Sequence, residues 1–217
     1  MFDQKLEELK KEIINYAFLV EKMIEKSIQG LLEKRGELLR EVIEKDEITA
    51  NELEIKIDEL VVTIIAKYEP KGKDLRMVLM ILKINNDLER MADHAVNICE
   101  SALFLIERPQ VKPYIDLPKI AKESISMLKD SIDSFIEENP KKAKGVCEKD
   151  YIVDDLNKKI FRELIDYMSK DPSTVERGFH IIRISNNIER IADLSTNISE
   201  DVIFMVEGKV IKHHKED

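Results

Sequence analysis

The stretch at residues 85–100, NNDLERMADHAVNICE, decides the fold because residues 185–200, SNNIERIADLSTNISE, repeat it. At an offset of 100 residues the identical pairs are Asn86 and Asn186, Glu89 and Glu189, Arg90 and Arg190, Ala92 and Ala192, Asp93 and Asp193, Asn97 and Asn197, Ile98 and Ile198, and Glu100 and Glu200. Such a duplication has to be identified before a fold is assigned, because each copy is one structural unit.

Around each copy the apolar residues follow the 3-4-3-4 spacing of a bundled helix. In the first copy this seam is Ile81, Ile84, Leu88, Met91, Ala95, Ile98, Ala102 and Leu105, and in the second it is Ile181, Ile184, Ile188, Ile191, Ser195, Ile198, Val202 and Met205. The helical period continues along the chain and is interrupted by proline and glycine at few places. We predict helices at about 3–36, 38–68, 73–107, 117–138, 141–170 and 173–207.

The predicted fold is all-α, with two tandem, homologous antiparallel three-helix bundles. Prolines cluster only in the stretch ERPQVKPYIDLPK, near the middle of the chain. We therefore expect a first bundle at 1–108, a Pro-rich linker at 109–117, a second bundle at 118–208 and a polar tail at 209–217. Helices of about 30 residues are roughly 45 Å long, so both bundles should be elongated.

Composition excludes several classes of protein. The chain has 217 residues and a formal charge of -9, which disfavours a nucleic-acid binder because phosphate neutralisation needs clustered Lys and Arg. No apolar run approaches the roughly 20 residues that span a bilayer, and the N-terminus has no signal-peptide pattern. The two cysteines, Cys99 and Cys147, suggest reduced thiols in the cytoplasm.

A polar stripe accompanies the apolar seam on the same helix. Its members, Asn86, Glu89, Asp93, Asn97 and Glu100, step by 3, 4, 4 and 3 residues and lie 100° or more around the helix from the seam. Like charges four residues apart destabilise a helix by about 0.2–0.5 kcal/mol, unless an Arg, a Lys or a metal ion offsets them. The stripe should therefore lie on the flank of the bundle.

Acid or amide pairs on the preceding helices would complete an oxygen-rich cation site. When Leu53 is aligned with Leu156, the pairs are Glu47 with Asn51 and Asp150 with Asp154. The first predicted metal set is Glu47, Asn51, Glu89 and Asp93, and the second is Asp150, Asp154, Glu189 and Asp193. The second set should bind metal more tightly, because an amide is a weaker ligand than a carboxylate.

The remaining residues of the repeated motif belong to a second layer around the metal or to a partner face: Asn97, Asn197, Glu100, Glu200, Arg90 and Arg190. We expect the two arginines to cover or bond to a neighbouring helix rather than to serve as counter-ions on their own helix. The alternative interpretation is that the acids are ordinary solvated surface charge, since the chain has 44 of them.

No residue pattern indicates catalysis. The sequence has no glycine-rich phosphate loop and no Ser, His and Asp set that stands out. The Glu-x-x-His element of ferritin-like di-iron bundles is missing from the acid-bearing helices. A ferritin-like metal-binding or redox bundle, and a metal-free helical scaffold, are therefore the alternatives to a regulatory protein.

Two stretches, DLERMADHAVNICE and NIERIADLSTNISE, each near the end of a three-helix repeat, resemble the PhoU family of phosphate-uptake regulators. The resemblance covers nearly the whole chain. It implies a cytoplasmic, commonly dimeric protein that binds multinuclear iron or zinc through acid-x-x-x-acid motifs. It also implies a non-enzymatic negative regulator of the phosphate regulon, which links the ATPase of the phosphate ABC transporter to a sensor histidine kinase and reaches the membrane only through these partners.

The chain departs from this pattern at two places. Asn51 stands where an acid would be expected, which weakens the first metal set. The entry to the last helix has Thr174, Val175 and Glu176 where the third helix has Asp74, Leu75 and Arg76. The second difference is consistent with two halves that bind different partners.

Overall fold

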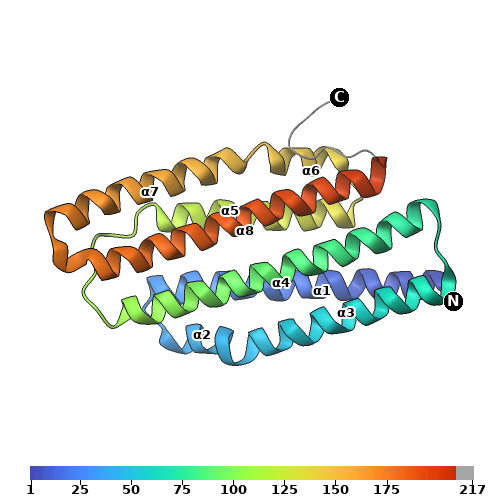
Figure 1. Cartoon of the computed structure of the whole chain (residues 1–217), viewed down its shortest axis with the longest axis horizontal. Coiled ribbons are helices and arrows are strands. Elements are labelled where there is room, and N and C mark those ends of the chain that lie inside the picture. Colours follow the sequence, from blue (N-terminus) through green and yellow to red (C-terminus); the bar gives the residue numbers. More distant parts are fainter. Residues whose placement is uncertain (209–217) are drawn as a thin grey trace.

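The computed structural model describes residues 1–208; the predicted polar tail at 209–217 lies outside the described residues. The elements in chain order are α1 (Phe2–Leu32), α2 (Gly36–Glu41), a π-helical turn (Val42–Asp46), α3 (Glu47–Tyr68), α4 (Gly72–Ile106), α5 (Leu117–Ile136), α6 (Pro140–Cys147), α7 (Asp150–Lys170), a 3-10 turn (Pro172–Thr174) and α8 (Val175–Glu207). Residues 1–208 contain no strand. The all-α prediction with two tandem three-helix units is confirmed (Figure 1).

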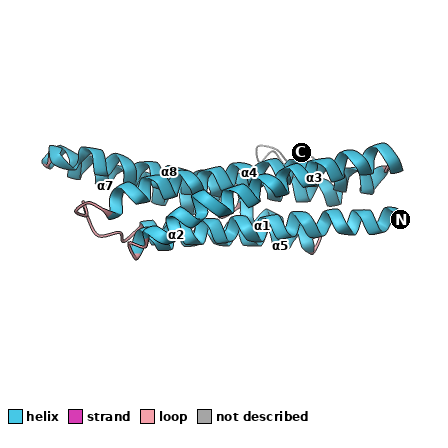
Figure 2. Cartoon of the chain, turned by 90° about the horizontal axis from the view of Figure 1, so that it is seen from below, coloured by secondary structure: helices cyan, strands magenta, loops and turns pink. Residues whose placement is uncertain are grey.

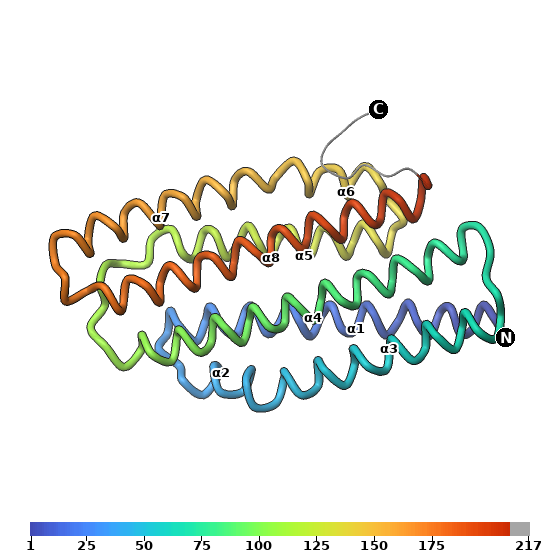
Figure 3. Tube along the Cα trace, in the orientation of Figure 1, coloured from blue at the N-terminus to red at the C-terminus, as the bar shows by residue number. Residues whose placement is uncertain are grey.

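Two predicted helices are less regular than the periodicity indicated. The second, expected at 38–68, begins at Gly36 and contains the π-helical turn, and Figure 3 shows the wide coil between α2 and α3. The fifth, expected at 141–170, is divided at Glu148 and Lys149 into α6 and α7. The apolar spacing did not mark either irregularity, because a single irregular turn involves too few residues to interrupt a pattern that is helical on both sides of it.

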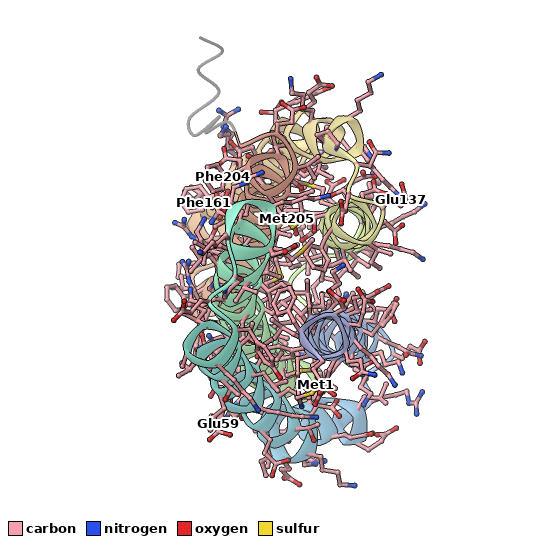
Figure 4. All side chains as sticks on the ribbon, turned by 90° about the vertical axis from the view of Figure 1, so that its right-hand side faces the viewer. Met1, Glu59, Glu137, Phe161, Phe204 and Met205 are labelled. Carbon is pink, nitrogen blue, oxygen red and sulfur yellow. The ribbon has the colours of Figure 1, made fainter. Side chains whose placement is uncertain are left out.

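The helices lie in two layers. Seen from the side and from the end, α3, α4, α8 and α7 are neighbours in one layer, and α1 and α5 form the other (Figures 2 and 4). Helix α1 packs on α3 and α4, while α5 packs on α6, α7 and α8. The longest contact between the two repeats is the one between α4 and α8. The repeated motif therefore lies on the two central helices of the molecule.

The two predicted seams form the cores of the two repeats. All eight seam residues of α4 and all eight of α8 are buried, and Leu88 and Ile188, at equivalent positions, have no exposed surface. On α3 the buried face includes Ala50 and Ile57, and on α7 it includes Val153 and Ile160. Burying a large aliphatic side chain contributes about 1.5–3 kcal/mol, so these seams supply much of the stability of each bundle.

The corners that end α1 and α5 have the same construction. The amide of Arg35 donates to the carbonyl of Gly30, and the amide of Asn139 donates to that of Ser134, both at 2.9 Å. In each corner the preceding residue is left-handed, with φ of 53° at Lys34 and 49° at Glu138. These bonds satisfy carbonyls that the helix end leaves open. The duplication thus extends to backbone detail outside the repeated motif.

Candidate functional site

The repeated polar stripe lies on the flank of the bundles, as the sequence predicted. On α4, Asn86, Asp93 and Glu100 are exposed, and Glu89 and Asn97 are half-buried. On α8 the side chains of Glu189 and Asp193 retain 21% and 36% of their exposure. The carboxylates therefore lie beside the core, within reach of both solvent and the neighbouring helix.

In the second repeat the structure brings the four predicted carboxylates into one electrostatic group between α7 and α8. Burial raises the pKa of Glu189, and the negative charges of Asp193, Asp154 and Asp150 raise it further, while Arg190 opposes them. Burial also raises the pKa of Asp193, with Arg190 opposing and Asp154 adding to the effect. The fold therefore keeps these four carboxylates in one group although their negative charges repel one another.

In the first repeat a further α3 residue, Glu54, acts on the motif beside the pair that the sequence predicted. Burial raises the pKa of Glu89, as do the charges of Asp93 and Glu54, and Asp93 in turn acts on Glu54. Glu47 and Asn51, the predicted partners, lie on the same stripe of α3, two turns and one turn nearer its start, and Asn51 is exposed. The structure therefore assigns Glu54 to this cluster, which sequence reasoning missed.

The outer helix has the same register against the motif helix in both repeats. The side-chain amide of Asn85 donates to the Glu54 carbonyl at 3.0 Å and to Asp58 Oδ1 at 2.9 Å. In the second repeat the Ser185 hydroxyl donates to Asn157 Oδ1 at 2.6 Å. These bonds fix which turn of each outer helix meets the motif, and they could not be inferred from spacing within one helix.

Tyr16 of α1 is a second residue that the sequence did not reveal. It is fully buried, and its hydroxyl has no hydrogen-bond partner within residues 1–208. Burial raises its pKa, and the charges of Glu54, Glu89 and Asp93 raise it further. A buried phenol in this position adds an oxygen to the first cluster, and only the packing of α1 against α3 and α4 brings it there.

The clusters have the donor chemistry for a hard cation but not a closed coordination shell. Within residues 1–208, no three His, Cys, Asp or Glu side chains converge closely enough to hold a metal ion. The carboxylates lie on facing helices and oppose each other's ionisation, and the Tyr16 hydroxyl lacks a partner, so the residue types fit an oxygen-bound cation. Both predicted metal sets stay predictions, with Glu54 added to the first.

The two motif arginines serve as counter-ions on their own helices, so the expectation that they bond across to a neighbouring helix was wrong. Arg190 lies 3.2 Å from Asp193 Oδ2 and 3.6 Å from Glu189 Oε2. Arg90 lies 3.6 Å from Asp87 Oδ1. Both arginines are more than half exposed, and an arginine at this spacing reaches its own helix more easily than the next one.

The residues that we predicted to form a second layer around the metal or a partner face have two different roles in the structure. Arg183 of α8 donates to Asn97 Oδ1 at 2.6 Å and to Glu100 Oε2 at 2.8 Å, and His94 Nδ1 donates to Asn187 Oδ1 at 2.8 Å. Asn97 and Glu100 thus hold the two repeats together along α4 and α8. Their counterparts differ: Asn197 is exposed and Glu200 is half-buried. Burial raises the pKa of Cys147 to about 11, and the charge of Glu200 adds to this effect.

Comparisons with known proteins agree with this architecture. The model of the PhoU domain matches residues 6–102 and 117–202, one match in each repeat. A phosphate-specific transport system accessory protein PhoU homolog of Aquifex aeolicus is 40% identical over 210 residues, which cover 97% of this chain and 95% of the relative.

Two solved structures share the fold. The crystal structure of PhoU from Pseudomonas aeruginosa superposes with a TM-score of 0.93 at 31% identity, covering 96% of this chain and all of that one. The crystal structure of the phosphate transport system regulatory protein PhoU from Streptococcus pneumoniae gives a TM-score of 0.89 at 27% identity, covering 98% of this chain and all of that one. No helix within residues 1–208 has the length and apolarity to cross a membrane. With both repeats matched and its length shared with these relatives, the chain belongs to the PhoU family.

Proposed function

We propose that this protein is a non-enzymatic regulator of phosphate transport that acts in the cytoplasm and lowers phosphate uptake and phosphate-starvation gene expression when phosphate is abundant. The observation that carries the proposal is the PhoU domain in both repeats, together with relatives named as accessory proteins of the phosphate-specific transport system. The proposed partners are the ATPase subunit of the phosphate transporter and a sensor histidine kinase, with the protein as a homodimeric adaptor between them.

The shape of the molecule supports an adaptor. The conspicuous polar residues form ladders along the flanks of long helices, in both repeats. Helices α3, α4, α8 and α7 present a broad surface on which a partner can be held at several points (Figure 4). A regulator that works through contact needs such an extended surface more than it needs a single deep pocket.

Complementation tests the regulatory role. In a bacterium whose own PhoU gene is deleted, we expect this chain to restore repression of a phosphate-starvation reporter in phosphate-rich medium. The purified chain should also bind the transporter ATPase and the kinase in separate pull-downs. A reporter that stays derepressed while the chain accumulates in folded form would contradict the proposal.

We further propose that Asp150, Asp154, Glu189 and Asp193 hold an iron or zinc ion between α7 and α8. A bound cation would offset the repulsion among these carboxylates and fix the two helices in register. If the ion binds one adaptor conformation more tightly than another, it shifts the population toward that conformation.

Metal content measured by elemental analysis, after purification without chelator, tests this second part. Asp193→Ala should lose metal, whereas the matched control Asp155→Ala should keep it, because the Asp155 side chain on α7 is 75% exposed and is not one of the four. Equal metal content in wild type and Asp193→Ala would count against the site. Glu54→Ala tests the first cluster in the same way.

A further inference from the structure

The outer surface between α7 and α8 carries large apolar side chains that face solvent. We define the α7/α8 face by Asn157, Phe161 and Ile165 of α7 and Phe179, Ile182 and Asn186 of α8. The hydrogen bond from Asn157 Nδ2 to Asn186 Oδ1, at 3.2 Å, shows that these two stripes are neighbours. The stripes continue at helical spacing from this bond, and Phe161 lies on the side of the molecule away from α1 and α5 (Figure 4).

The apolar part of this face is too exposed to be explained by packing within the chain. Phe161, Ile165 and Phe179 retain 45%, 47% and 63% of their exposed surface. Single exposed apolar residues are ordinary on protein surfaces, but a contiguous group with a polar rim marks an interaction site. Aromatic side chains at its centre are the residues that contribute most to binding energy in protein interfaces.

Unpaired positive charge borders the apolar group. A hollow of about 200 Å³ is lined by Phe161, Arg162, Lys158, Asn157 and Asn186. Among residues 1–208, no carboxylate lies within ion-pair distance of Arg162. Its neighbours Lys158 and Lys159 both have carboxylate partners. An exposed arginine beside an aromatic ring is suited to a carboxylate on a partner, because its planar donors bind both oxygens.

The first repeat supplies an internal comparison. The buried residues Ala50, Ile57 and Val61 of α3 match Val153, Ile160 and Leu164 of α7 at an offset of 103 residues. At this offset Asp58 and Glu59 stand where the second repeat has Phe161 and Arg162. The same surface is therefore built twice. Both copies expose apolar side chains, with Val62 and Leu79 in the places of Ile165 and Phe179, but the first copy adds acids where the second has an aromatic and a basic residue. This difference in charge favours different partners for the two copies.

We propose that the α7/α8 face docks an acidic amphipathic helix of a partner protein, whose apolar side chains pack on Phe161, Ile165 and Phe179 and whose carboxylate pairs with Arg162. The inference deepens the proposed function and rests on it, since an adaptor needs a defined surface for each partner. Its occupant is a helix because a groove between two helices accepts apolar anchors spaced three and four residues apart.

Two synthetic helical peptides test the docking site by fluorescence anisotropy with the full chain. Both have Leu and Phe on one face, and the flanking positions are Glu in one peptide and Lys in the other. We expect the Glu peptide to bind and the Lys peptide to bind at least tenfold more weakly. Phe161→Ala and Arg162→Glu should each raise the Kd for the Glu peptide by about tenfold or more. Both residues are exposed, so the fold should survive, which circular dichroism checks.

The matched control is Glu59→Lys, the equivalent position on α3, which should leave the Kd for the Glu peptide within about twofold of wild type. Equal affinity for both peptides, no measurable binding of the Glu peptide, an unchanged Kd in Arg162→Glu, or an equal effect of Glu59→Lys would each overturn the proposal. So would Arg162-dependent binding to vesicles of anionic lipid in place of the peptide.

The reporter assay separates this inference from the proposed function. If wild type represses the phosphate-starvation reporter but Arg162→Glu binds the peptide like wild type, the docking site fails alone. If wild type does not repress the reporter while Arg162→Glu loses the peptide, the regulatory role fails and the docking site stands.

Discussion

The α3/α4 pair and the α7/α8 pair occupy equivalent places in the two repeats, but their surfaces differ in charge and in aromatic residues. On α3, Asp58 accepts a hydrogen bond from Asn85, whereas its counterpart Phe161 on α7 faces solvent. The buried seams below are alike in both pairs. The comparison shows that the duplication has preserved packing while the charged residues of the outer faces have diverged, and a difference of this kind lets two surfaces favour different partners.

The strongest test of this comparison is made in the seams. Leu88→Ala and Ile188→Ala remove equivalent, fully buried side chains, and each should lower the free energy of unfolding by about 2–5 kcal/mol. Urea denaturation followed by circular dichroism measures the change. The control Ile48→Ala, on the exposed side of α3, should change stability by less than about 0.5 kcal/mol. A small cost at one seam position only would show that the two cores are not equivalent.

The next largest expected effect on stability comes from a position whose charge differs between the repeats. Asp87 is buried on α4, where its counterpart on α8 is Asn187. Burial raises the pKa of Asp87 to about 6, and the charge of Asp201 also raises it, while Arg90 and Lys83 oppose. A carboxyl whose pKa is higher in the folded state binds more protons when folded, so stability falls as pH rises from about 4 to about 6.

Asp87→Asn removes this cost and makes the first repeat like the second. Stability should rise by about 1–3 kcal/mol at pH 7 and change little at pH 4, where Asp87 is already protonated in the folded state. Melting temperatures measured across this pH range provide the test. A gain of equal size at both pH values would mean that packing, and not charge, causes it.

The corners that end α1 and α5 differ at one position, and this difference should have a smaller effect on stability. Gly30 lies in the place of Ser134, and a Cβ added at Gly30 would come within 2.5 Å of Leu39 Cδ2. Overpacking of this kind costs about 1–3 kcal/mol, and better helix propensity returns up to about 1, so Gly30→Ala should destabilise the protein by about 1–2 kcal/mol. Thermal unfolding measures the change, and Leu39→Ala in the same chain should reduce the additional cost of Gly30→Ala. Stabilisation by Gly30→Ala alone would show that the corner has room.

The smallest effect concerns the motif arginines. Arg190 pairs with Glu189 and Asp193 at the surface, so Arg190→Ala should cost less than about 1 kcal/mol and should raise the pKa of Asp193 further. Arg90→Ala should leave Asp193 unaffected. Carboxyl titration followed by NMR distinguishes the two variants, and an unchanged Asp193 pKa in Arg190→Ala would mean that the pair is not maintained in solution.

The sequence by itself determined the all-α class, the duplication and the buried seams, because apolar spacing within one helix records which face is buried. It also placed the acid stripes on the flanks, since angular position around a helix follows from spacing alone. It did not reveal the π-helical turn at Val42–Asp46 or the break before α7, because each involves too few residues to interrupt the helical pattern on both sides of it.

Only the tertiary structure decided which residues from different helices meet. Glu54 of α3 and Tyr16 of α1 join the electrostatic group of Glu89, because the axial register between helices depends on packing and on bonds such as the one from Asn85 to Asp58. The exposure of Phe161 and Phe179 was likewise settled by the neighbours that each helix receives. Spacing along one chain segment specifies angle around a helix, but it contains no information about how far two helices slide along each other.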